Sequence, residues 1–186
     1  MLNSFYDKFI FTNSLQYRHN NFFLVNLPFV MLPVDALAAI ASKEDKEANC
    51  SIYYAVKASI IEDVKKNLQL DFGVGGEKAL EFMQSYLIAS GWGDIQRTDI
   101  DFENARCLVS VTNSPIAQAC KQAKAPADTI LRGFLAGIFS IYFSRKVECI
   151  EVKCASLGDA HCDFVVKPLE EFNFENPLTR GQLRVE

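Results

Sequence analysis

Apolar side chains recur every three or four residues in several stretches of the chain, as they do along one face of an α-helix. The pattern is clearest over about residues 52–70, where acidic and basic residues occupy the opposite face. Further helices are expected at about residues 35–46, 77–90 and 129–144, together with a short helix that contains Cys120.

Short apolar runs bounded by polar turns lie between these helices and are typical of β-strands. They are expected at about residues 9–12, 22–27, 95–102, 106–111, 147–153 and 162–167. The first two runs would pair around a polar turn, and the last two would complete an antiparallel sheet. The whole pattern predicts a single α+β domain, in which an antiparallel sheet of four or more strands packs against a layer of helices.

The helix expected at about residues 129–144 is apolar on two faces. Such a helix is buried between layers, or packs on the sheet with one face and on a partner or ligand with the other. Gly133 and Gly137 thin its surface, so that another backbone or a flat ligand could approach closely.

The length and charge of the chain limit the classes of function that it can have. A chain of 186 residues is long enough for one domain with a substantial core. The domain is expected to span residues 1–167, and the polar residues 168–186 are expected to form a loosely held tail. A formal net charge of −4 leaves no basic excess to neutralise a phosphate backbone, so nucleic-acid binding is not expected.

Six cysteines occur in a chain whose first residues show no charged leader followed by an apolar run and a cleavage site. A cytoplasmic protein is therefore expected, with cysteines that are metal ligands or buried thiols rather than disulfides. The longest apolar stretch, residues 22–40, is interrupted by Asn26, Pro28, Pro33 and Asp35, so no membrane span is expected.

Three residues near the C-terminal end combine donor types that zinc accepts. Glu151 stands three residues before Cys154, and a loop with the Gly158–Asp159 turn separates Cys154 from Cys162. Thiolate sulfur and carboxylate oxygen both bind zinc, and a tight turn would bring the three side chains to one ion. Glu151, Cys154 and Cys162 are therefore candidate ligands at the two ends of a hairpin.

The run that contains these three residues, from Val147 to Phe164, resembles the C-terminal signature of the 4-vinyl reductase domain family. Similar segments occur earlier in the chain, at Gly91–Gly93, Thr112–Pro115 and Leu131–Gly137, so the resemblance extends over roughly residues 9–167. This family includes the sensory domains of phenol- and xylene-responsive activators and many proteins described as hydrocarbon-binding. The resemblance implies a fold related to subunits of the transport-particle tethering complex, with an apolar ligand pocket.

The resemblance also implies a fourth metal ligand. In the phenol-sensing relatives a cysteine at the start of the buried helix completes the set, and that position falls here on Asp128. Aspartate is a competent zinc ligand, but Asp128 also stands where a helix N-cap is expected. If Asp128 only caps the helix, Cys149 or Cys120 could be the fourth ligand, or the site could be empty.

His161 ranks below these candidates, because it and its neighbour Cys162 would point to opposite faces of a strand. Four protein ligands leave no open position for a substrate, so a zinc ion held in this way would be structural.

Fifteen phenylalanines make the apolar content unusually aromatic, which suits either plain core filling or the lining of a cavity. Trp92, the only tryptophan, could be a wedge between helix and sheet or a ligand contact. The residues expected to line a ligand pocket are Trp92, Phe134, Ile138, Phe139 and Tyr142.

The favoured function is a binding or sensory domain for an apolar, aromatic or lipid-like molecule, which acts through a partner protein or a change of oligomeric state. A homodimer is expected from the resemblance and from the doubly apolar helix. The alternatives are an interaction scaffold like the tethering-complex subunits, and a tetrapyrrole reductase accessory protein. Enzyme activity is not favoured, because the only histidines, His19 and His161, stand in no recognisable catalytic pattern.

Overall fold

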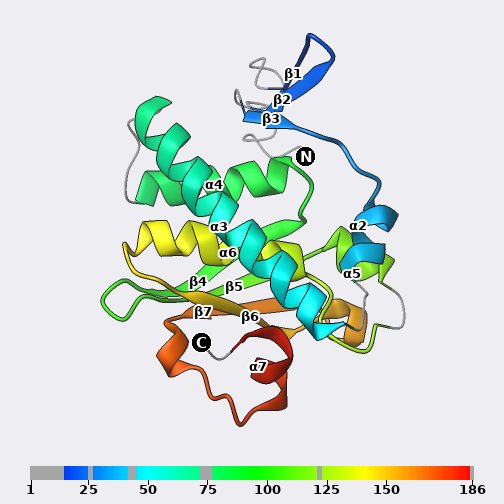
Figure 1. Cartoon of the computed structure of the whole chain (residues 1–186), viewed down its shortest axis with the longest axis vertical. Helices are drawn as coiled ribbons and strands as arrows, with labels where there is room; N and C mark the ends of the chain where they lie inside the picture. Colours follow the sequence, from blue (N-terminus) through cyan, green and yellow to red (C-terminus); the bar gives the residue numbers. More distant parts are fainter. Residues whose placement is uncertain (1–14, 25–26, 42–44, 72–76, 121–122, 185–186) are drawn as a thin grey trace.

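The computed structural model describes residues 15–24, 27–41, 45–71, 77–120 and 123–184. This part of the chain forms the predicted α+β domain, with a three-stranded and a four-stranded antiparallel sheet and six α-helices (Figure 1). The strands are β1 (Leu15–Arg18), β2 (Asn21–Leu24), β3 (Leu27–Phe29), β4 (Asp94–Asp101), β5 (Arg106–Thr112), β6 (Glu148–Lys153) and β7 (Cys162–Lys167). The helices are α2 (Val34–Ala41), α3 (Lys46–Asp71), α4 (Glu77–Ala89), α5 (Pro115–Ala119), α6 (Thr129–Tyr142) and α7 (Pro177–Gln182). The strand expected at residues 9–12 lies outside the described residues.

The larger sheet has the order β4-β5-β7-β6, and every neighbouring pair is antiparallel, so β4 and β6 are its edges. In its register, Glu151 pairs with Phe164 on β7, and Cys162 pairs with Val111 on β5. The β6–β7 hairpin thus brings the end of one strand beside the start of the next.

Helices α3, α4 and α6 lie on one side of this sheet, and α6 lies nearest to it (Figure 1). Alternating residues of β5 and β7, with Leu131, Leu135 and Phe139 of α6, form one cluster of buried apolar side chains. This burial follows from the period-two pattern of the strands and the two apolar faces of the helix. No helix in the described part of the chain is both long enough and apolar enough to cross a membrane.

The contact between α3 and α6 depends on the two glycines of α6. A Cβ atom at Gly133 would lie 2.9 Å from the carbonyl oxygen of Tyr53, and one at Gly137 would lie 2.7 Å from a side-chain carbon of Ile60. The glycines therefore serve the close approach of another helix, which is one of the two possibilities that the sequence left open.

Two helix ends differ from the predictions. Helix α3 begins at Lys46 rather than near residue 52, because the Asp45 side chain accepts hydrogen bonds from the backbone N–H groups of Glu47 (2.9 Å) and Ala48 (3.2 Å). The helix expected at residues 35–46 ends at Ala41. The capping aspartate thus starts α3 at the residue where the preceding helix was expected to end.

The expectation of a loosely held C-terminal tail is wrong. Phe172 and Leu183 are buried, and α7 packs against the edge strand β6 and against α3 (Figure 1). The Gln182 side chain accepts a hydrogen bond from the backbone N–H of Glu151 (2.9 Å) and donates one to its carbonyl oxygen (2.8 Å). A single amide side chain therefore pairs with the edge strand as a neighbouring strand would.

Candidate metal centre and apolar cavity

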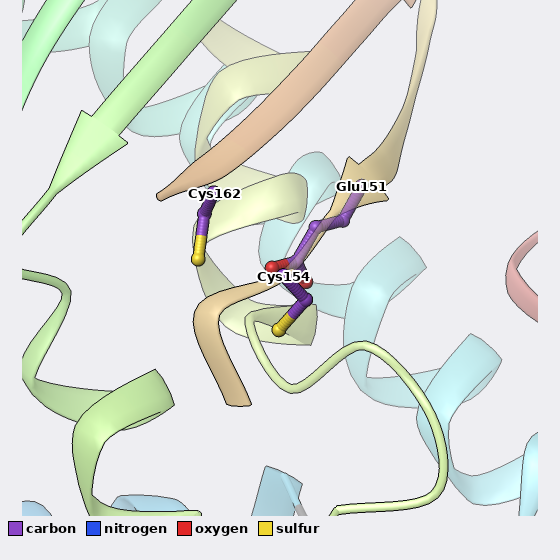
Figure 2. A group of neighbouring side chains, drawn as sticks. All are labelled: Glu151, Cys154 and Cys162. Carbon is purple, nitrogen blue, oxygen red and sulfur yellow. The ribbon is translucent and has the colours of Figure 1, made fainter. Parts of the chain in front are cut away.

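The predicted ligands Glu151, Cys154 and Cys162 come together in the structure. Their donor atoms lie within 4.8 Å of one another, and all three side chains are buried. Figure 2 shows Glu151 on β6, Cys154 in the turn that follows this strand and Cys162 at the start of β7, with their side chains gathered in one place. We call these three residues the donor cluster.

The turn between the two cysteines fixes their positions. After Cys154 the chain forms a single 3₁₀ turn, Ala155–Leu157, and Gly158 then takes φ of 101°, a conformation that favours glycine. The Asp159 carboxylate accepts a hydrogen bond from the Cys154 backbone N–H (2.8 Å). The Ala155 N–H donates to the sulfur of Cys162 at 3.3 Å, the kind of support that metal-bound thiolates receive from surrounding groups.

Asp128 stands at the N-cap position of α6, but its side chain makes no capping hydrogen bond. Its carboxylate instead accepts hydrogen bonds from the Ser114 hydroxyl at 3.0 and 3.2 Å, and it also contacts the Cys162 thiol. The Asp128 backbone N–H donates to Glu151 Oε2 at 3.1 Å. The Asp128 side chain therefore does not cap its own helix, and it is not among the donor atoms that lie within 4.8 Å of one another.

Burial at the cluster disfavours the negatively charged forms of the two carboxyl groups. Burial raises the pKa of the Glu151 carboxyl to about 10, and it raises that of Asp128 to about 6. A hydrogen bond from Cys162 lowers the pKa of the Cys154 thiol to about 5 and raises that of Cys162. Among the described residues Glu151 Oε1 has no hydrogen-bond partner although it is buried. A divalent cation would satisfy this oxygen and offset the negative charges, so the residues fit a zinc ion.

The other candidates lie outside the donor cluster. The Cys120 thiol donates to the carbonyl oxygen of Ala38 at 3.6 Å. Burial raises the pKa of Cys149, which keeps this thiol protonated. His161 pairs with Asp163 at 3.1 Å. All six cysteines are free and buried.

A buried polar network that the sequence did not reveal holds the backbone of Glu151 in the donor cluster. Arg132, one turn into α6, is buried and donates to the side-chain oxygen (2.7 Å) and the backbone oxygen (3.2 Å) of Gln182. Its guanidinium group also lies 4.7 Å from the centre of the Tyr53 ring. Because Gln182 holds both backbone groups of Glu151, this network links α3, α6, α7 and β6 next to the cluster.

An apolar cavity of about 720 Å³ lies on the helical side of the molecule. Its walls come from residues 28–34, α3, α4, the Ser90–Trp92 turn, the start of α5 and the first half of α6. Trp92 and Phe134 line it, and their rings contact each other edge to face with 5.2 Å between the ring centres. This volume is in the range of small-molecule sites.

The other three predicted pocket residues do not line this cavity. Ile138 and Phe139 line a separate small void above the sheet. The Tyr142 hydroxyl donates to Glu77 at 3.0 Å. Residues 28–34 and Tyr86, which the sequence did not single out, form part of the cavity wall instead. No periodic pattern could have found them, because they meet only when the helices are packed.

Comparisons with known proteins agree with this architecture. Residues 108–168 match the family model of the 4-vinyl reductase domain. The crystal structure of the phenol-responsive sensory domain of the transcription activator PoxR with phenol is similar, with a TM-score of 0.72, 17% identity and coverage of 91% of each chain. No curated protein sequence matches the chain significantly.

Two further solved structures align with lower TM-scores. One is a trafficking protein particle complex subunit 3 from Naegleria fowleri covalently bound to palmitic acid, with a TM-score of 0.45, 15% identity and coverage of 72% of this chain and 93% of that one. The other is a vinyl-4-reductase family protein from Methanocaldococcus jannaschii, with a TM-score of 0.37, 20% identity and coverage of 75% and 96%.

The matched segment contains Asp128, the donor cluster and all of α6, so the resemblance to the 4-vinyl reductase domain family is confirmed, with the matching domain at residues 108–168.

Proposed function

We propose that this protein is a small-molecule binding or sensory domain that holds an apolar molecule in the cavity beside Trp92. The cavity of about 720 Å³ carries this proposal, because most of its wall is aliphatic and aromatic. The sensory domain of similar fold was crystallised with phenol, which supports a small-molecule role for the same architecture.

We further propose that Glu151, Cys154, Cys162 and Asp128 hold a structural zinc ion. The ion would join the β6–β7 hairpin to the start of α6, which are separate in sequence and adjacent at the cluster. Zinc at this place supplies charge compensation and a cross-link, and four protein ligands leave no position for a substrate.

Helix α6 connects the two proposed sites. Its N-cap residue, Asp128, lies next to the donor cluster, and its residues Ile130 and Phe134 line the cavity. A ligand against Phe134 and a metal ion at Asp128 would therefore act on the same rigid element. In this way ligand binding could change the surface that a partner protein or a second copy meets.

Native mass spectrometry of the purified, untagged protein tests the binding function. A retained apolar adduct that is released by denaturation is the expected result. A protein free of any adduct, which also fails to take up added apolar compounds, would contradict the proposal. A coloured tetrapyrrole complex would instead support the accessory-protein alternative.

The scaffold alternative has one observation in its favour. The side chains of Val30, Met31 and Leu32 are 79%, 60% and 55% exposed, which forms an apolar run on the surface at the cavity wall. Such a run suits contact with a second copy, in line with the expected homodimer. Light scattering with and without an apolar ligand tests this alternative, because a scaffold keeps its oligomeric state, whereas a sensory domain that acts through oligomerisation changes it.

A further inference from the structure

We propose that the natural ligand of the cavity is a neutral molecule, larger than a single aromatic ring, with an apolar body and one hydroxyl or carbonyl group that meets Tyr86. This inference rests on the proposed binding function and adds the chemical class of the ligand.

The described part of the cavity wall carries no charged side chain, which disfavours an ionised ligand. None of the described residues that line the cavity is Asp, Glu, Lys, Arg or His. A carboxylate taken from water into such surroundings would lose its hydration without gaining a counter-charge, which costs several kcal/mol. A fatty acid would therefore bind only with its head group outside.

Tyr86 is one of three hydroxyl-bearing residues in the described wall of the cavity, with Ser59 and Ser90. Tyr86 lines the cavity, and its hydroxyl has no hydrogen-bond partner among the described residues. Burial raises its pKa, with no charged neighbour contributing, so it stays protonated and can donate or accept one hydrogen bond. By contrast, the Ser90 hydroxyl already donates to the carbonyl oxygens of Tyr86 (2.8 Å) and Leu87 (3.1 Å).

The volume sets a lower limit on ligand size. A cavity of roughly 150 Å³ is enough to hold benzene. The cavity here measures about 720 Å³, so a single ring would leave most of it unfilled. A ligand that leaves apolar space unfilled makes fewer dispersion contacts with the wall, so the cavity favours a ligand with a longer or multi-ring body.

Trp92 makes the test simple, because it is the only tryptophan and lines the cavity. The purified protein, stripped of apolar adducts, is titrated at neutral pH with 1-decanol, decanoate and phenol while the Trp92 emission is followed. We expect saturable binding of 1-decanol, and dissociation constants at least about 10-fold higher for decanoate and for phenol.

The outcomes separate this inference from the binding function. Decanoate that binds as tightly as 1-decanol would overturn the neutral-ligand inference and leave the binding function intact. Phenol that binds as tightly as 1-decanol would overturn the lower limit on ligand size. If no compound changes the emission, the binding function itself fails.

Two variants test the residues that carry the inference. Tyr86→Phe should raise the dissociation constant of 1-decanol by roughly 2- to 10-fold, which corresponds to the loss of one hydrogen bond. It should leave the dissociation constant of 1-chlorodecane unchanged. Equal losses for both compounds would overturn the role of Tyr86. Leu32→Lys adds a cation to an exposed part of the wall, and it should shift the ratio of the two dissociation constants toward decanoate by roughly 2- to 5-fold.

Ile100→Lys is the matched control for Leu32→Lys, because Ile100 is also exposed and lies on β4, outside the described cavity wall. It should leave the ratio of the two dissociation constants unchanged. If Leu32→Lys behaves like this control, the absence of charge does not set the ligand class and the inference is wrong.

Discussion

At the scale of single residues, Asp128 stands at the N-cap of α6 without capping it. An N-cap aspartate normally accepts hydrogen bonds from the first free N–H groups of its helix. Asp128 instead accepts from Ser114, and its backbone N–H contacts Glu151. Sequence reasoning found the residue through a family resemblance, and the residue type alone left its role open, because aspartate suits both a cap and a metal ligand.

The Asp128→Asn variant separates these two roles. Asparagine caps a helix as well as aspartate does, but it lacks the negative charge and binds zinc poorly. We expect the zinc dissociation constant to rise by about 10-fold or more. It can be measured by competition with a chromophoric chelator. Unchanged zinc affinity would show that Asp128 is not a ligand.

At the scale of elements, the packing of α3 on α6 depends on small residues. The sequence predicted the helix at about residues 129–144 and noted its glycines, but it could not say whether a helix or a ligand lies against them. The structure places the α3 backbone and the Ile60 side chain there.

Gly133→Ala should destabilise the protein although alanine is the better helix former. The added methyl group would lie 2.9 Å from the Tyr53 carbonyl oxygen and from Val56. We expect a loss of about 1–3 kcal/mol in the free energy of unfolding, measured by urea denaturation. Gly181→Ala in α7 is the control, because a Cβ atom there has no neighbour within 4 Å. Equal effects of the two substitutions would contradict the close-packing explanation.

The C-terminal segment is the second element whose role can be tested. Gln182→Ala would leave the backbone N–H and carbonyl of Glu151 and the Arg132 side chain without their partner. We expect the free energy of unfolding to fall by about 1–3 kcal/mol. We also expect weaker zinc binding, because Glu151 would be held less firmly. Arg180→Ala, an exposed change in the same helix, should have neither effect. A Gln182→Ala protein as stable as the wild type would mean that the tail is only loosely held after all.

At the scale of the whole molecule, the sequence predicted what depends on local periodicity. It indicated the α+β class, the four strands of the larger sheet and the donor cluster, because the hairpin that carries the cluster is short. It did not reveal the cavity, whose walls come from segments spread over residues 28–134. It also missed the docked tail, since polar residues such as Gln182 indicate exposure until their buried partners are known.

Metal removal tests how the molecule is held together. Chelation of a protein with one bound zinc ion should lower Tm by roughly 5–10 °C. A decrease of about 3 kcal/mol in the free energy of unfolding has this effect in a domain of this size. Metal analysis and thiol titration before and after chelation measure the zinc content and the newly accessible thiols. The Cys154→Ser protein should show the same lower Tm and loss of zinc. The Cys107→Ser protein should keep its zinc, because Cys107 is a buried cysteine outside the donor cluster. A Cys154→Ser protein with wild-type Tm and zinc content would contradict the structural role.

The central claim, that the cavity beside Trp92 binds an apolar small molecule, is tested most directly by ¹⁹F NMR of protein that carries fluorotryptophan. Trp92 is the only tryptophan, so the spectrum should contain one resonance from the cavity wall. We expect this resonance to shift and saturate as 1-decanol is added, with one binding event per chain. A resonance that does not change, up to the solubility limit of 1-decanol and of other neutral apolar compounds, would show that the cavity is not a ligand site.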